Sequence, residues 1–146
     1  MLDLAPGDEV IVPSFAFVST ANAFVIHGAT PVFADIRPDT LNLDEEQVEA
    51  HITSRTRAIV ALHYGGVACE MGVLSESAQR HHLLLIEDNA HGLSGAYNGR
   101  ALGSLRQLAT LSFHETKNYT CGEGGAYAYH CTLGLRKKNN SISYRR

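Results

Sequence analysis

The sequence predicts an α/β protein whose sheet is mostly parallel and carries helices on both faces. Short apolar runs alternate along the chain with stretches in which apolar residues recur at helical spacing. The runs contain almost no polar interruptions, which is typical of parallel strands covered on both sides. The connections between runs are long enough for right-handed βαβ crossovers. No polar–apolar alternation and no hairpin turn is evident, so we exclude an all-β sandwich.

The first part of the chain contains two predicted strands, residues 9–12 and 31–35. Between them, residues 18–27 carry apolar positions at helical spacing, which predicts a helix. Gly28 follows directly and is a natural helix C-cap residue. This order of elements is that of a βαβ unit.

Asp44 is expected to cap a helix over residues 44–51, because its carboxylate can accept a hydrogen bond from a backbone N–H of the first turn. Glu45 and Glu46 favour the same helix end electrostatically. The later predicted elements are strands at residues 58–62, 83–86, 108–112 and 125–129 and a helix at residues 71–80.

The composition is that of a globular protein rather than a disordered, collagen-like or membrane-spanning one. The 146 residues are 45% hydrophobic and 18% charged, with 13 Gly and 4 Pro, and suffice for one ordinary domain. No apolar run approaches the ~20 residues that span a bilayer. Residues 1–6 lack the basic and apolar regions of a signal peptide. The net charge of −3 gives no reason to expect a nucleic-acid partner.

The three cysteines, Cys69, Cys121 and Cys131, are widely spaced and odd in number. They form neither a disulfide framework nor a CxxC metal motif. We therefore expect a reducing, cytoplasmic location and no metal site.

Charge is distributed unevenly along the chain. All 15 acidic residues and seven of the 12 basic ones lie in residues 1–125, whereas residues 126–146 hold five bases and no acid. The composition changes abruptly near Tyr127. We therefore divide the chain into a domain at residues 1–126 and a basic tail at residues 127–146, which we expect to be aberrant or disordered.

Polar residues follow several predicted strands, and ligands of open α/β sheets bind at the carboxyl ends of strands. Asp88 follows the strand at 83–86, and Lys117 follows the strand at 108–112. A lysine amine can form a Schiff base with a carbonyl and then move protons as a general acid and base. An aspartate can keep a pyridine nitrogen protonated, and pyridoxal phosphate needs both groups. Lys117 is also the only lysine in residues 1–125.

Less specific interpretations of the same residues stay open at this point. On spacing alone, Lys117 also fits a solvated surface group, and Asp88 also fits a helix N-cap. The remaining candidates also fit ordinary structural roles. His91 and His114 could pack or form hydrogen bonds, and Phe17 could belong to the core. Ser112 could simply end a strand, and residues 122–125 could form a tight turn.

Three segments of the chain resemble the DegT/DnrJ/StrS family of pyridoxal-phosphate-dependent sugar-nucleotide aminotransferases. The segments are residues 13–23, Glu-Asp-x-Ala-His at 87–91, and Ser-Phe-His-x-x-Lys-Asn at 112–118 followed by Gly-Glu-Gly-Gly at 122–125. The last of these is highly specific, and the second is moderately so. The likeness extends from about Pro6 to Ala126.

The resemblance implies a role for five residues. Lys117 would bind the aldehyde of pyridoxal 5′-phosphate (PLP), and Asp88 would pair with its pyridine nitrogen. His91 would lie beside the ring, and Ser112 would contact the phosphate. Phe17 falls where the family places an aromatic ring stacked on the cofactor.

The resemblance also implies fold, substrates and assembly. Residues 1–126 would be part of the large domain of the aspartate-aminotransferase-like fold. The sequence of these segments is most similar to that of a branch of the family that aminates dTDP-4-keto-6-deoxyglucose. That branch uses glutamate as amino donor and serves the synthesis of the enterobacterial common antigen. Family members work as homodimers with sites at the subunit interface.

Two departures from the family pattern bear on activity. Members carry a Gly-Thr/Ser-rich phosphate-binding segment before the position of Met1 and a small domain after the position of Ala126, and this sequence contains neither. We therefore expect a fragment, and we favour a frameshift or truncated reading frame over a genuine short form. Lost phosphate contacts of about 1.5–3 kcal/mol each would leave the isolated chain inactive or nearly so.

Three alternative functions remain. A PLP-binding dehydratase relative would carry histidine in place of the Schiff-base lysine, and Lys117 argues against it. A non-catalytic α/β module that pairs with an intact homologue is kept open by the abrupt tail. A nucleotide-binding Rossmann protein is disfavoured, because no GxGxxG follows the first predicted strand.

Overall fold

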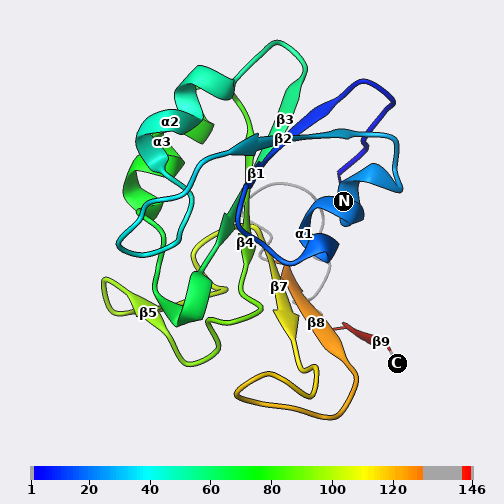
Figure 1. Cartoon of the computed structure of the whole chain (residues 1–146), viewed down its shortest axis with the longest axis vertical. Helices are drawn as coiled ribbons and strands as arrows, with labels where there is room; N and C mark the ends of the chain where they lie inside the picture. Colours follow the sequence, from blue (N-terminus) through cyan, green and yellow to red (C-terminus); the bar gives the residue numbers. More distant parts are fainter. Residues whose placement is uncertain (1, 130–142, 146) are drawn as a thin grey trace, which may run out of the picture. The chain divides into compact units, whose positions relative to one another are not determined.

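The computed structural model describes residues 2–129 and 143–145 (Figure 1). The described residues fall into two compact units. Unit 1 contains the residues up to Leu62 together with Cys69–Leu85, and unit 2 contains His63–Ala68 together with the residues from Ile86 onward. The chain therefore contributes residues 63–68 to unit 2, returns to unit 1, and belongs to unit 2 from Ile86 onward, which lies inside strand β4 (Leu84–Asp88).

The strands of unit 1 form a parallel arrangement centred on β1 (Glu9–Pro13). β1 pairs in parallel with β2 (Thr30–Ala34) on one side and with β3 (Thr56–Leu62) on the other. Every residue of β1 is buried, as expected for a central parallel strand covered on both faces. The predicted parallel pairing is thus confirmed in this unit.

Helices cover both faces of the unit 1 strands. Figure 1 shows α1 (Val18–Val25) on one side of the strands, with α2 (Glu45–Val48) and α3 (Met71–Arg80) on the other. This placement is what right-handed crossovers give when the strand order is β2-β1-β3. A short 3₁₀ turn, η1 (Glu49–His51), extends α2. The core of this unit includes Val10, Ile11, Leu43, Val48, Ile59, Met71 and Leu74, all buried.

The predicted helix ends of unit 1 are confirmed in atomic detail. Asp44 Oδ1 accepts a hydrogen bond from the N–H of Glu46 at 3.1 Å, and Oδ2 accepts from Nε2 of Gln47 at 2.8 Å. Gly28, after α1, has φ of 86°, a left-handed conformation that only glycine adopts without strain.

The strands of unit 2 form a mixed arrangement. The end of β4 pairs in parallel with β7 (Leu108–Ser112), so that Asp88 lies opposite Thr110. β7 then pairs antiparallel with β8 (Gly125–Tyr129), which pairs antiparallel with β9 (Ser143–Arg145). The predicted α/β class with a mostly parallel sheet is confirmed. Because β4 and β7 are parallel, their carboxyl ends lie at the same edge.

A small hairpin in unit 2 corrects one expectation. The chain was expected to hold no hairpin turn, but β5 (Ala96–Tyr97) and β6 (Arg100–Ala101) pair antiparallel around Asn98 and Gly99. Both turn residues have positive φ, 50° and 76°. Asn-Gly is the strongest short signal for a two-residue turn of this hand. The expectation was nevertheless wrong, because strands of two residues are too short to show an alternating pattern.

The expected boundary at residue 126 falls inside β8, which continues to Tyr129. Residues 130–142 and 146, and with them Cys131, lie outside the described residues, so the aberrant or disordered character of residues 127–146 stays a prediction. Among the helices that the structure describes, none is long and apolar enough to cross a membrane.

Candidate active site

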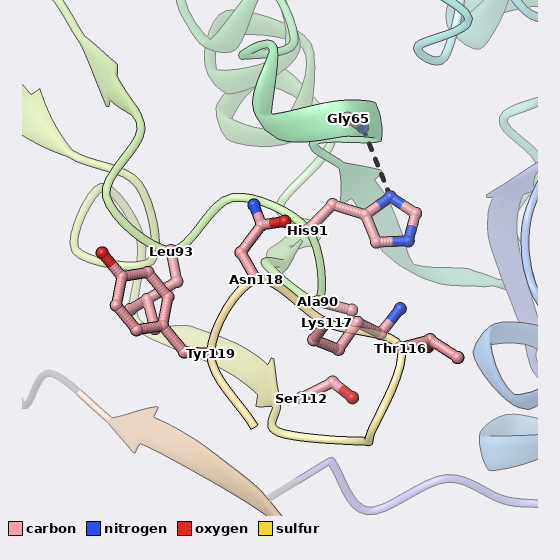
Figure 2. A pocket seen from close by; sticks show the side chains of 9 residues that line it. All are labelled: Gly65, Ala90, His91, Leu93, Ser112, Thr116, Lys117, Asn118 and Tyr119. Atoms are coloured by element: carbon pink, nitrogen blue, oxygen red, sulfur yellow. Dashed lines mark hydrogen bonds between the residues drawn. The ribbon is translucent and has the colours of Figure 1, made fainter. Parts of the chain in front are cut away.

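Unit 2 contains a cavity of about 230 Å³ at the carboxyl ends of β4 and β7 (Figure 2). Its walls come from the loop after β4, the loop after β7 and the short turn η2 (Tyr64–Gly66). The polar side chains that line it are those of His91, Ser112, Thr116, Lys117, Asn118 and Tyr119. Polar side chains from the loops after two adjacent parallel strands thus meet at one edge of the sheet within unit 2.

Lys117 enters the cavity from a tight turn that follows β7. The N–H of Lys117 donates to the carbonyl oxygen of His114 at 2.9 Å, and the N–H of Cys121 donates to that of Phe113 at 3.0 Å. These bonds fold the loop back on itself. Figure 2 shows the amine of Lys117 on the same side of the cavity as the His91 ring. The half-buried side chain thus presents its nitrogen to the cavity interior.

Ser112 and His114 lie on either side of the point where β7 ends. Ser112 is the last residue of the strand, and its side chain lines the cavity. His114 is exposed, and its Nδ1 lies 3.1 Å from Oγ1 of Thr116 within the same loop. His114 therefore has the local hydrogen-bonding role that its spacing also allowed.

His91 lies in the loop after β4 and packs against η2. Its ring meets the ring of Tyr64 edge to face, with centroids 5.3 Å apart, and its Nδ1 lies 3.3 Å from the N–H of Gly65. Burial lowers the pKa of His91, and the charge of Lys117 lowers it further, whereas the charge of Asp88 raises it. The net shift is downward, so the neutral ring is favoured near pH 7.

Asp88 is the last residue of β4, next to the cavity loop. Its Oδ1 accepts a hydrogen bond from the N–H of Ala90 at 3.2 Å. The alternative of a helix N-cap finds no support, because no helix follows Asp88 before β5 at Ala96. The carboxylate instead closes a short turn that carries the chain from the strand toward His91.

Glu87 is a buried acid that the sequence analysis did not single out. Its side chain is fully buried and accepts hydrogen bonds from three backbone N–H groups and from His63. A charged residue at the end of an apolar strand run was the available signal, because carboxylates are almost never fully buried unless they are paired.

The five predicted site residues divide between the two units. Lys117, Asp88, His91 and Ser112 all lie in unit 2, at the ends of β4 and β7. Phe17 belongs to unit 1, where it stands directly before α1 with 76% of its surface exposed. Its expected role against a cofactor stays a prediction.

Comparison with protein families decides the relationship. The model of the DegT/DnrJ/EryC1/StrS aminotransferase family matches residues 1–130. The chain belongs to this family. The resemblance seen in the three sequence segments is thereby confirmed.

Two curated family members are similar over most of this chain. The spore coat polysaccharide biosynthesis protein SpsC of Bacillus subtilis (strain 168) is 47% identical over 122 residues, which are 84% of this chain and 31% of that protein. The GDP-perosamine synthase of Caulobacter vibrioides is 48% identical over 124 residues, 85% of this chain and 33% of that protein. The chain spans about a third of the length of these relatives.

Solved structures of family members have the same fold. DesI, solved in the presence of its TDP-sugar product, is 47% identical and superposes with a TM-score of 0.79 over 84% of this chain and 31% of DesI. The PLP-form of Spr1654 from Streptococcus pneumoniae is 30% identical, with a TM-score of 0.83 over 87% of this chain and 36% of that one. The fold is therefore part of a PLP-dependent aminotransferase fold.

Members of this family use PLP, and the residues of the unit 2 cavity fit that cofactor. An amine that can bind an aldehyde, a hydroxyl that can donate to a phosphate and a neutral aromatic ring line one cavity, with a carboxylate at its edge. Gly66 keeps the η2 turn close to this loop, because a Cβ there would lie 3.3 Å from the carbonyl oxygen of His91. In the described residues, no group of three or more potential ligands is arranged for a metal ion.

Proposed function

We propose that this chain carries the PLP-binding part of a sugar-nucleotide aminotransferase. The observation that carries the proposal is the meeting of Lys117, Ser112 and His91 in one cavity beside Asp88, at the adjacent carboxyl ends of two parallel strands. A pyridine aldehyde cofactor requires an amine that can bind its aldehyde and a carboxylate that can pair with its ring nitrogen.

Each residue would contribute a separate task. Lys117 would bind the cofactor aldehyde through its amine and afterwards move a proton between substrate and cofactor carbons. Asp88 would hold positive charge on the pyridine nitrogen, and Ser112 would donate a hydrogen bond to the phosphate. His91 would pack against the ring without adding charge, since its pKa is lowered. The bound cofactor supplies an electron sink for the carbon that carries the amine.

For the substrate, we propose a dTDP-linked 4-keto-6-deoxy sugar with glutamate as amino donor. This is the reaction of dTDP-4-amino-4,6-dideoxygalactose transaminase, which serves a cell-surface polysaccharide. Support comes from the sequence segments at residues 87–91 and 112–118 and from the similarity to DesI, whose structure was solved with a TDP-sugar product. The similarity to a GDP-perosamine synthase makes a GDP-linked sugar the alternative to be tested.

For the assembly, we propose a cytoplasmic homodimer of the intact enzyme. The support is the family to which the chain belongs. The chain spans about a third of the length of its curated relatives. A non-catalytic piece that pairs with an intact homologue is the competing function.

A half-reaction separates these two functions. The 146-residue chain is incubated with PLP, and glutamate is added while the visible absorbance of the bound cofactor is followed. We expect a slow, glutamate-dependent loss of the visible band, which dTDP-4-keto-6-deoxyglucose restores more efficiently than its GDP-linked counterpart. The Lys117→Arg chain is the control and should form no such band.

Because the lost phosphate contacts are expected to leave the isolated chain nearly inactive, its rate is compared with that of free PLP and glutamate without protein. A rate no greater than that background would contradict amino transfer by this chain and favour the non-catalytic alternative. More efficient restoration by the GDP-linked sugar would contradict the proposed nucleotide and leave the transaminase proposal standing.

A further inference from the structure

Glu87 is a fully buried carboxylate with four hydrogen-bond donors. Its Oε1 accepts from the backbone N–H groups of Leu105 and Arg106, both at 2.7 Å. Its Oε2 accepts from the N–H of Gly103 at 2.7 Å and lies 3.2 Å from Nε2 of His63. Burial raises the pKa of Glu87, but these hydrogen bonds outweigh it and lower the pKa overall. The buried group is therefore an ionised carboxylate.

His63 connects this carboxylate to the end of β4. Its ring is fully buried against Glu87, while its backbone N–H donates to the carbonyl oxygen of Asp88 at 3.1 Å. Side chains alternate between the faces of a strand, so the carboxylates of Glu87 and Asp88 project to opposite sides. One histidine thus holds the side chain of Glu87 and the main chain of Asp88 at once.

The turn after His63 leads directly to His91. The N–H of Gly65 lies 3.3 Å from Nδ1 of His91, as Figure 2 marks, and the ring of Tyr64 packs edge-on against the same imidazole. A backbone N–H can only donate, so Nδ1 must accept. A neutral His91 held in this way carries its proton on Nε2.

The cost of this arrangement argues for a role beyond packing. Ionisable pairs in an interior are weak evidence for stability, because apolar residues of similar volume often stabilise a fold at least as well. Where such pairs are kept, the best-supported use is to specify one geometry. The geometry specified at this position is that of the Asp88 main chain and of the His91 ring, which lines the same cavity as Lys117 and feels the charge of its amine.

We propose that Glu87 is a positioning residue which, through His63 and the Tyr64–Gly66 turn, fixes the main chain at Asp88 and holds the His91 ring with its proton on Nε2. This inference rests on the proposed function, because the residues that Glu87 would hold in place belong to the proposed cofactor site. Glu87 itself touches neither the cavity nor the reacting groups, since its carboxylate is enclosed by the four donors described above.

The first test needs no cofactor. Imidazole ¹⁵N chemical shifts and a pH titration are recorded for His91 in the ¹⁵N-labelled 146-residue chain, with His91→Asn to assign the signals. We expect the proton on Nε2 and a pKa below the ordinary value, the latter for the burial and charge reasons given above. A neutral ring protonated on Nδ1 would overturn the inference without any substitution.

Two substitutions then break the connection at different points. Glu87→Gln removes the charge from the carboxylate, and His63→Ala removes the ring while leaving the three backbone donors on Glu87. Both should move the pKa of His91 upward, toward the ordinary value, as the ring becomes freer and more hydrated. His63→Gln, whose amide N–H can still donate to Glu87, should restore part of the difference.

Glu49→Gln is the matched control, because Glu49 also bonds a histidine, His81, at 2.7 Å, but does so on the surface of unit 1. It should leave the His91 pKa unchanged. Folded Glu87→Gln and His63→Ala chains with an unchanged His91 pKa would overturn the inference. Unfolding of both would do so too, because the network would then be a stability element only.

A second test uses the cofactor. PLP affinity is measured by titration of the visible band, and Glu87→Gln should weaken it about tenfold, which corresponds to about 1.4 kcal/mol, whereas Glu49→Gln should not. The two proposals fail separately. If the unaltered chain binds no PLP, the proposed function fails, while the cofactor-free titration of His91 still decides the role of Glu87.

Discussion

At the scale of single residues, the site depends on where Ser112, Lys117 and Asp88 lie relative to the ends of β4 and β7. Ser112 ends β7 with its side chain in the cavity, and the turn closed by the Lys117 N–H brings the amine back over the same edge. Asp88 ends the neighbouring parallel strand and closes the turn toward His91. The parallel register, in which Asp88 lies opposite Thr110, therefore brings two strand ends that are far apart in the sequence to one edge of the sheet.

Replacing Ser112 by alanine should weaken PLP binding. A hydroxyl that donates to a phosphate makes a charge-assisted hydrogen bond of roughly 1.5–3 kcal/mol, so the Kd should rise about 10- to 100-fold. Equilibrium titration of the visible cofactor band measures the change. Ser54→Ala, in an exposed loop of unit 1, is the control. An unchanged Kd for Ser112→Ala would exclude this hydroxyl as a phosphate ligand.

His91 should make stability depend on pH. Because its pKa is lowered in the folded chain, the unfolded chain takes up this proton first as the pH falls below about 6.5. The free energy of unfolding therefore decreases with falling pH until the folded His91 is protonated as well, and it recovers above that window.

Denaturant unfolding at pH 5 and pH 8 measures this effect. His91→Asn should lose less stability on acidification than the unaltered chain, since the other seven histidines contribute to both. Equal losses in the two chains would show that burial of His91 does not disfavour its protonation.

At the scale of elements, local sequence signals predict several helix ends correctly. Asp44 caps α2 through its own carboxylate, and α3 runs over Met71–Arg80 as its apolar spacing predicts. The Asn98–Gly99 hairpin was missed because two-residue strands carry no periodicity. The Glu87–His63 pair was missed because it joins positions 24 apart in the sequence, and only the fold brings them together.

Asp44→Ala should lower the free energy of unfolding by about 1 kcal/mol, because the backbone donor of Glu46 loses its partner. The matched control is Glu70→Ala. Glu70 stands at the same position of α3 but makes no capping hydrogen bond through its side chain, so its replacement should change stability by less than about 0.5 kcal/mol. Chemical denaturation of both variants gives the comparison, and equal effects would contradict a capping role for Asp44.

Gly99→Ala should destabilise the β5–β6 hairpin by about 1–2 kcal/mol, because φ at this position is 76° while nothing lies within 4 Å of the added Cβ. The cost is thus purely conformational. Asn98→Gly, at φ of 50° in the same turn, should be nearly neutral. Amide hydrogen exchange of residues 96–101 reports the local loss. Faster exchange in Asn98→Gly than in Gly99→Ala would contradict this turn conformation.

At the scale of the whole molecule, the described chain contributes two parts with different content. Unit 1 supplies parallel strands covered by helices on both faces. Unit 2 contains four of the five expected site residues, of which Lys117, His91 and Ser112 line the cavity. The fold class was predictable from the alternation of apolar runs and helical spacing, and the edge that holds the site from the rule that parallel strands end together. The family and the cofactor were predictable from the motifs at residues 87–91 and 112–118, which resemble those of known aminotransferases. The chain spans about a third of the length of its curated relatives, so the sugar and the assembly belong to the proposed function.

Everything proposed for the site depends on Lys117 binding PLP in unit 2. The most direct measurement is to incubate the purified chain with PLP, reduce it with borohydride and map the modified lysine by peptide mass spectrometry. We expect a stoichiometric adduct at Lys117 that is lost when Asp88 is changed to alanine. A label that is absent, or scattered over Lys137 and Lys138, would contradict PLP binding by Lys117, because the family's residues would then be present without a working cofactor site.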